Sequence, residues 1–143
     1  MMLKDVLAAK GRPRIVTVPA KSSVSDAIRT MCAEKVGAVM VPDAESCPVG
    51  IFTERDVVRL YAEGERDFDQ LLVEARMTCS VVVGRLSMPV DEALGLMTAG
   101  RFRHLPVLEE GKLLGLVSIG DLVKSKLDEA AQEAQALRAY IAS

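Results

Sequence analysis

The chain has 143 residues, of which 50% are apolar and 27% charged, and its formal net charge is −2. This length fits one compact unit or two small halves that share a core, and the charge gives no general attraction to nucleic acid or to anionic membranes. We expect neither a signal peptide nor a membrane span, because no apolar run is long enough. Its three cysteines, Cys32, Cys47 and Cys79, are odd in number and widely spaced, which argues against a disulfide framework or a zinc site and favours a reducing, cytoplasmic compartment.

The first half of the chain predicts two helices and three strands. A β-branched run at residues 15–18 predicts a strand, and apolar residues at helical spacing over residues 24–31 predict a helix. Two further apolar runs, at residues 36–41 and 49–52, flank a stretch of turn residues and predict a pair of strands. A helix should begin at Thr53.

The second half repeats this order. The matching segments are a strand at residues 81–83, a helix over residues 90–97, strands at residues 105–108 and 113–117, and a helix that begins at Ser118. The phrase "GIFTERDVV", which starts at residue 50, returns 65 residues later as "GLVSIGDLV". An internal repeat of this kind predicts two copies of one supersecondary unit, with the order β-α-β-β-α.

The last segment differs from the repeats. Residues 121–143 contain no Gly or Pro and are rich in strong helix formers, so they predict one long helix. Two uses remain open for it: packing on its own domain, or self-association through a narrow apolar stripe. The stripe consists of Val123, Leu127, Ala130, Ala134, Leu137 and Ile141.

Each copy of the repeated phrase places a hydroxyl three residues before an aspartate. Thr53 with Asp56, and Ser118 with Asp121, fit a helix capping box, which by itself needs no ligand. The same geometry also suits a ligand, because a helix N-terminus attracts phosphate and a carboxylate one turn further on can accept hydrogen bonds from a ribose diol. Both readings remain open, and capping in the empty protein is compatible with binding in the filled one.

Two copies of β-α-β-β-α that carry this phrase, the second preceded by "RHLPV", resemble a tandem cystathionine-β-synthase (CBS) domain pair, also called a Bateman module. The resemblance implies an α/β fold in which two repeats related by a pseudo-twofold axis form one module, with a C-terminal helix added. The implied boundaries are residues 1–62 for an N-terminal helix and strand plus the first repeat, 63–76 for a linker, 77–127 for the second repeat and 128–143 for the helical extension.

The resemblance also implies a function: non-catalytic binding of an adenosine-containing nucleotide (AMP, ADP, ATP, NAD or S-adenosylmethionine) in clefts between the repeats, as an energy or metabolite sensor. AMP, ATP or NAD would be the ligand, with no catalytic cofactor and no metal. Asp56 and Asp121 would hold riboses, with Thr53 and Ser118 near phosphate or ribose. The resemblance further implies that the backbone around Val36, Gly37 and Ala38 recognises an adenine edge. Thr17 and Val82 would line the opposite wall of the cleft, and Ile51 and Leu116 would pack on the base.

The two copies differ in charge. The second carries Arg101, Arg103 and His104, and arginine and protonated histidine pair well with phosphate, although a solvated basic rim is the alternative. The first copy instead carries Arg55, where the second has Gly120. We therefore expect two non-equivalent sites that differ in affinity or ligand, or of which one stays empty.

Ahead of both copies, Lys10, Arg12 and Arg14 could contact a phosphate or could form a basic entry loop.

Rival functions fit less well. An enzyme needs a base, a nucleophile and oxyanion donors, which one histidine and scattered cysteines do not supply. A ligand-free structural or dimerisation adaptor would use the repeated phrase for capping alone. Nucleic-acid binding is disfavoured by the net charge and by the 3% aromatic content. The expected partners are a nucleotide, a second copy that pairs through the CBS helices and the C-terminal helix, and an effector protein of unknown identity.

Overall fold

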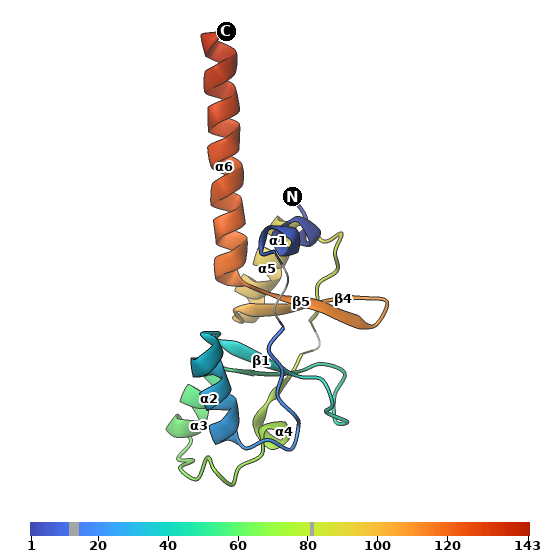
Figure 1. Cartoon of the computed structure of the whole chain (residues 1–143), viewed down its shortest axis with the longest axis vertical. Coiled ribbons are helices and arrows are strands. Elements are labelled where there is room, and N and C mark those ends of the chain that lie inside the picture. The colour runs from blue at the N-terminus through green and yellow to red at the C-terminus, as the bar shows by residue number, and fades with distance from the viewer. Residues whose placement is uncertain (12–14, 81) are drawn as a thin grey trace. The chain divides into compact units, whose positions relative to one another are not determined.

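A computed structural model describes residues 1–11, 15–80 and 82–143 (Figure 1). The chain divides into two compact units. We call Arg14–Val82 the first-repeat unit, and Met1–Pro13 together with Val83–Ser143 the second-repeat unit. Within the described residues, no helix is long and apolar enough to cross a membrane.

The first-repeat unit is a small antiparallel sheet with helices. Its strands β1 (Ala38–Val41), β2 (Gly50–Thr53) and β3 (Thr78–Cys79) lie in that order, and its helices are α2 (Val24–Glu34), α3 (Glu54–Ala62) and α4 (Val73–Arg76). The apolar stripe predicted on α2 faces inward, because residues spaced three and four apart share one helical face. The core consists of Val18, Ala20, Val24, Ala27, Met31, Val39, Val41, Phe52, Leu60 and Val73.

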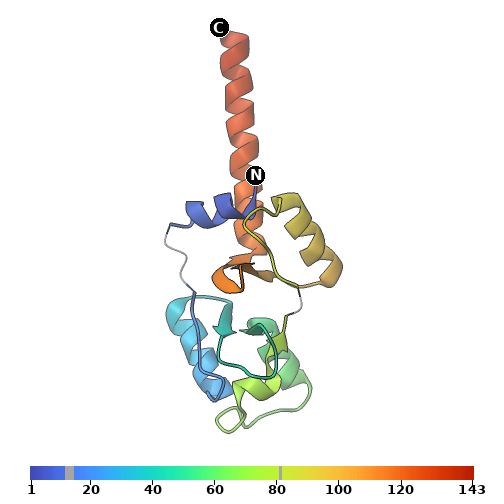
Figure 2. The ribbon, with the colours of Figure 1, turned by 90° about the vertical axis from the view of Figure 1, so that its right-hand side faces the viewer.

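The second-repeat unit is built around a two-stranded β-hairpin with helices. Strands β4 (His104–Glu109) and β5 (Lys112–Ser118) pair antiparallel, and the helices are α1 (Leu3–Ala9), α5 (Val90–Gly100) and α6 (Ile119–Ala142). A two-residue turn joins the strands, and both its residues, Glu110 and Gly111, have positive φ, as tight hairpin turns require. Figures 1 and 2 show α1 beside the first turns of α6.

The two units confirm the predicted α/β class, with a repeated helix–strand–strand–helix order and a C-terminal helix. The first strand of each repeat is shorter than the sequence predicts. Thr17 forms a single parallel bridge to Met40, and Gly84 forms one to Val107, with no continuous ladder in either place. Val81, part of the strand predicted at residues 81–83, lies outside the described residues.

The short helix that precedes each repeat packs on the other repeat. Helix α1 enters the second-repeat unit, where Leu3 N–H donates to Met88 O at 2.9 Å and Val90 N–H donates to Met1 O at 3.0 Å. The sequence groups residues 1–62 with the first repeat, whereas these contacts tie the start of the chain and α1 to the second-repeat unit. Side-chain packing decides this placement, since Leu3 is fully buried.

Helix α4 makes the reciprocal contacts in the first-repeat unit. Val73 N–H donates to Ser22 O and Val24 N–H donates to Leu71 O, both at 2.8 Å, and Val73 is fully buried. Residues 63–76, which the sequence predicts as a linker with a helical turn or two, contribute the short helix α4 to this core. We call the segments that carry α1 and α4 the exchanged segments.

The structure contradicts the expectation that the cysteines do not pair. Cys47, in the loop between β1 and β2, and Cys79, in β3, form a disulfide with their Cα atoms 5.7 Å apart. The 32 residues between them hide this proximity from the sequence, because the pairing of β3 with β2 creates it. Cys32 is free and exposed. The cytoplasmic location stays a prediction.

If each exchanged segment belongs to the core of the unit it packs in, a substitution in it should destabilise that unit. Leu3→Ala should lower the stability of the second-repeat unit by about 2–5 kcal/mol, because it empties a fully buried position. Hydrogen exchange followed by mass spectrometry should then accelerate in β4 and β5. The matched variant Val73→Ala should accelerate exchange in β1 and β2 instead. Faster hydrogen exchange in β1 and β2 of Leu3→Ala would contradict the placement of α1 in the second-repeat unit.

Candidate functional site

The same helix N-terminus occurs in both units, built from the repeated phrase. Thr53 Oγ1 accepts from the Asp56 N–H at 3.3 Å, and Asp56 Oδ2 accepts from the Thr53 N–H at 2.9 Å. Ser118 and Asp121 form the matching pair, at 3.0 and 2.8 Å. The predicted capping boxes are therefore present, and each holds a hydroxyl and a carboxylate at the positive end of a helix.

Asp56 is the one charged side chain in the described core, with 3% of its surface exposed. Its Oδ1 accepts from Thr78 Oγ1 at 3.0 Å and forms an ion pair with Arg59, while Thr53 Oγ1 lies 3.2 Å from Oδ2. Burial of a carboxylate is costly unless it is paired and hydrogen-bonded. The donors around Asp56 meet that requirement and occupy both carboxylate oxygens.

Asp121 is more accessible, with 25% of its side chain exposed. Lys10 Nζ lies 2.8 Å from Asp121 Oδ2 and also donates to Leu116 O at 3.2 Å. Burial raises the pKa of Asp121, but the hydrogen bond and charge of Lys10 and the hydrogen bonds from Ser118 outweigh it, so this pKa lies below its ordinary value. The carboxylate is therefore ionised at neutral pH.

Each aspartate thus receives one donor from an exchanged segment. Thr78 follows α4 and reaches Asp56, and Lys10 follows α1 and reaches Asp121. The sequence alone identifies neither contact, since both depend on which repeat the segment joins. Arg59 could have been found, because it lies three residues after Asp56 on one face of α3. Arg12 and Arg14 lie outside the described residues.

The three basic residues predicted in the second copy lie at different places relative to Ser118. His104, half-buried in β4, is the register partner of Ser118 on β5, and the Ile119 N–H donates to Arg103 O at 2.8 Å. The Arg103 side chain is exposed. Arg101 ends α5 in the left-handed region, with φ 55°, and is also exposed. The structure therefore brings His104 and Arg103 to the start of α6.

In the first copy the corresponding positions are apolar. Ala38, which is buried, is the register partner of Thr53, and the Glu54 N–H donates to Gly37 O at 3.0 Å. Arg55 is exposed on α3. The two helix N-termini therefore share a backbone arrangement but differ in charge.

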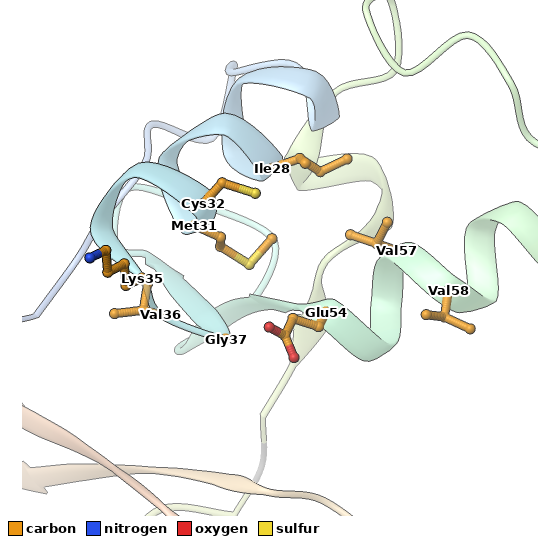
Figure 3. A pocket seen from close by; sticks show the side chains of 9 residues that line it. All are labelled: Ile28, Met31, Cys32, Lys35, Val36, Gly37, Glu54, Val57 and Val58. Atoms are coloured by element: carbon orange, nitrogen blue, oxygen red, sulfur yellow. The ribbon is translucent and has the colours of Figure 1, made fainter.

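A pocket of about 460 Å³ opens beside these residues on the helical side of the first-repeat unit (Figure 3). It includes two of the three residues predicted at an adenine edge, Val36 and Gly37, but neither Thr53 nor Asp56 lines it. Apolar side chains of α2 and α3 form most of its wall. The lining residues are Ile28, Met31, Cys32, Lys35, Val36, Gly37, Glu54, Val57 and Val58.

The remaining predicted residues vary in accessibility. Leu116 in β5 is half-buried, whereas Ile51 in β2 is 5% exposed and belongs to the packed interior. Thr17 is exposed at its bridge to Met40, and Val82 is half-buried after β3, within the first-repeat unit. Within the part of the chain that the structure describes, no group of three His, Cys, Asp or Glu side chains could hold a metal ion.

Comparison with known sequences identifies the family. The family model for the CBS domain matches residues 3–63 and 72–128. The mitochondrial CBS domain-containing protein CBSX3 of Arabidopsis thaliana is 31% identical over 97% of this chain and 71% of its own length. CBSCBSPB3 of the same plant is 36% identical over 90% of this chain, which spans only 24% of that longer protein.

Solved structures agree with this family. The CBS-domain protein ATU1752 of Agrobacterium tumefaciens has a TM-score of 0.81 and 43% identity, over 88% of this chain and 99% of its own. Two structures at 24% identity share the fold. They are a hexameric CBS-CP12 protein from bloom-forming cyanobacteria, with TM-score 0.75 over 98% of this chain and 87% of its own, and PAE2072 of Pyrobaculum aerophilum in complex with AMP, with TM-score 0.71 over 85% and 89%. With two matched segments that cover most of its length, the chain belongs to the CBS domain family.

Proposed function

We propose that this protein is a non-catalytic regulatory module that binds an adenosine-containing nucleotide. One observation carries the proposal: the pairing of a hydroxyl with a carboxylate at a helix N-terminus occurs twice, in the same hydrogen-bonded geometry. Capping alone explains either copy. The cationic and hydroxyl donors that converge on the same two carboxylates go beyond the needs of a cap.

The chemistry of each part matches a part of a nucleotide. The free N–H groups of a helix N-terminus and its macrodipole suit a phosphate. An ionised carboxylate can accept hydrogen bonds from both hydroxyls of a ribose. PAE2072, which shares the fold, is solved with AMP, so AMP is the first ligand to test. ATP, ADP, NAD and S-adenosylmethionine carry the same adenosine and follow it.

The two sites should differ, with the Asp121 site the stronger. Its carboxylate is partly exposed, and the described hydrogen bonds to it from Ser118 N–H and Lys10 use Oδ2. Arg103 and His104 lie at the start of the same helix and suit a phosphate. Both oxygens of Asp56 are already engaged. A nucleotide can shift the module between two shapes only if it binds one of them better.

The proposal predicts nucleotide-dependent stabilisation. At a concentration of about a hundred times the dissociation constant, the bound nucleotide should add about 2.7 kcal/mol to the free energy of unfolding and raise Tm. Asp121→Asn keeps a capping oxygen but loses the charge that binds ribose, so its dissociation constant should rise about tenfold or more. Thermal shift and calorimetry against the five nucleotides measure both effects.

Asp56→Asn is the matched control, because it makes the same change at the capping box of the first repeat. Asp56→Asn should leave the dissociation constant of the stronger site, at Asp121, unchanged. If no nucleotide raises Tm at millimolar concentration, the nucleotide-binding function is refuted. If Asp56→Asn weakens the tighter site more than Asp121→Asn does, the order of the sites is reversed.

The Lys10–Asp121 pair predicts a pH dependence. Because the folded pKa of Asp121 is lowered, the pair stabilises the fold above the unfolded pKa of about 3.9 and ceases to do so as pH falls through the folded value. Lys10→Met should cost about 0.2–1 kcal/mol at neutral pH, since the pair is partly exposed. The difference from wild type in urea unfolding should shrink below about pH 4.

Lys4→Met removes an exposed lysine from α1, the helix that Lys10 follows, and serves as the control. It should unfold like wild type at both pH values. A Lys10→Met deficit that persists undiminished at pH 3 would show that Lys10 acts through packing rather than through its charge on Asp121.

We also propose that the protein is a homodimer that uses the end of α6. Every residue from 130 to 143 is exposed, although the helix runs to Ala142, and an isolated helix of that length is marginal in water. Its apolar stripe includes Leu127, Leu137 and Ile141, all well exposed. In a parallel pair of such helices, Glu133 of one copy faces Arg138 of the other, so the charges are complementary. The family resemblance implies a further contact between copies through the CBS helices.

Leu137→Glu should convert the dimer to a monomer, because it places a charge within the apolar stripe. Ala139→Glu, two residues further on and on the opposite face of α6, adds the same charge and should leave the mass unchanged. Sedimentation equilibrium measures both. A monomeric wild type would refute the homodimer, and a dimeric Leu137→Glu would remove α6 from its interface.

A further inference from the structure

Cys47 and Cys79 form a bond that the proposed nucleotide chemistry does not use. Cys79 is exposed and Cys47 is half-buried, so a reductant in solution can reach the disulfide. Exposed disulfides are the ones most readily reduced and the ones used for regulation, unlike those shielded in a core. The pair therefore satisfies the first requirement of a redox-sensitive site, which is access.

The bond restrains a short strand at the edge of its sheet. Strand β3 has only two residues and lies at the edge of its sheet, paired with Gly50 and Ile51 of β2. Beyond it, the Ser80 N–H donates to Val49 O at 2.9 Å. Both cysteines belong to this region, since Cys47 lies three residues before β2 and Cys79 pairs with Gly50. The disulfide thus links β3 to the loop that enters β2.

The restrained segment contacts the candidate site. Thr78, directly before Cys79, donates to Asp56 Oδ1 at 3.0 Å. That oxygen would have to accept a ribose hydroxyl if Asp56 bound a nucleotide in the proposed way. While β3 is held against β2, Thr78 competes with the ribose for the same acceptor. Release of β3 would leave the oxygen to Arg59, whose side chain is about half exposed and can move.

We propose that Cys47 and Cys79 are a reversible thiol–disulfide site, reduced by small dithiols or by dithiol proteins, that controls nucleotide binding at Asp56 through Thr78. The inference rests on the proposed nucleotide function. In the oxidised protein Thr78 blocks Asp56, and the module binds one nucleotide, at Asp121. In the reduced protein β3 detaches, and Asp56 binds a second.

The exchange balances in two steps. A thiolate of the reductant attacks Sγ of the exposed Cys79, and Cys47 leaves as a thiolate that takes up a proton. The second thiol of the reductant then attacks the mixed disulfide and releases Cys79 as a thiol. Two electrons and two protons pass from the reductant, which leaves as a disulfide, to the two cysteines.

The redox step is tested on the full chain by maleimide labelling under denaturing conditions and mass spectrometry. Oxidised protein should take up one maleimide, at the free Cys32, and dithiothreitol-treated protein should take up three. Removing the dithiothreitol and adding glutathione disulfide should restore the single adduct. Three adducts without reductant, or one adduct after it, would overturn the reversible site.

The mechanical step is tested by hydrogen exchange. Reduction should accelerate exchange of residues 77–80 at least tenfold, while α2 and the second-repeat unit keep their rates. Cys47→Ser should reproduce the reduced pattern, and Cys32→Ser should behave as wild type in both states. Unchanged exchange at residues 77–80 on reduction would overturn the switch, whether or not nucleotide binds.

The coupling is tested by calorimetry with AMP in the two redox states. We expect one occupied site per chain in the oxidised protein and two in the reduced protein. Reduction should raise the affinity of the Asp56 site about tenfold, because the ribose then replaces Thr78 as a hydrogen-bond donor to the charged carboxylate. Thr78→Val keeps the side-chain shape and removes the donor, so it should bind two nucleotides in both states. Equal stoichiometry and affinity in both states, with Thr78→Val like wild type, would refute the coupling. Absence of AMP binding in either state would refute the ligand and leave the labelling and exchange results to judge the switch.

Discussion

A carboxylate one turn into a helix is the constraint around which each unit is built. Asp56 and Asp121 each tie a strand end to a helix start through reciprocal hydrogen bonds with Thr53 or Ser118. Each also accepts a hydrogen bond from an exchanged segment, Asp56 from Thr78 and Asp121 from Lys10. Because a carboxylate near the interior must be matched by donors, these contacts hold strand, helix and exchanged segment together. The same groups are the ones that a nucleotide would use.

The repeats have diverged at this shared point. The first surrounds its carboxylate with Arg59 and Thr78 and buries it, which favours a structural role in the empty protein. The second leaves its carboxylate partly open beside Lys10 and places His104 and Arg103 at the start of α6. A duplicated fold can in this way keep one backbone geometry while the accessibility and the charged neighbours of its two carboxylates differ.

The exchanged segments also connect the site to the rest of the molecule. Thr78, which donates to the buried Asp56 carboxylate, directly precedes Cys79, so the proposed reduction of the disulfide would act on that carboxylate through one hydrogen bond. Lys10 follows α1, which lies beside the first turns of α6, and α6 carries the apolar stripe proposed to join two copies. The proposed redox control would thus act within the first-repeat unit, and the proposed pairing of two copies within the second-repeat unit.

The sequence by itself determined the repeat, the helix and strand order, the capping pairs and the family, because local spacing and short-range hydrogen bonds encode these features. It also predicted the charge difference that Arg103 and His104 create. Only the tertiary structure decided that α1 joins the second repeat, that Lys10 and Thr78 reach the aspartates, and that Cys47 meets Cys79. These contacts join residues far apart in the chain, and burial of Leu3 and Val73 selects them. No local pattern records which of two similar cores a short helix will enter.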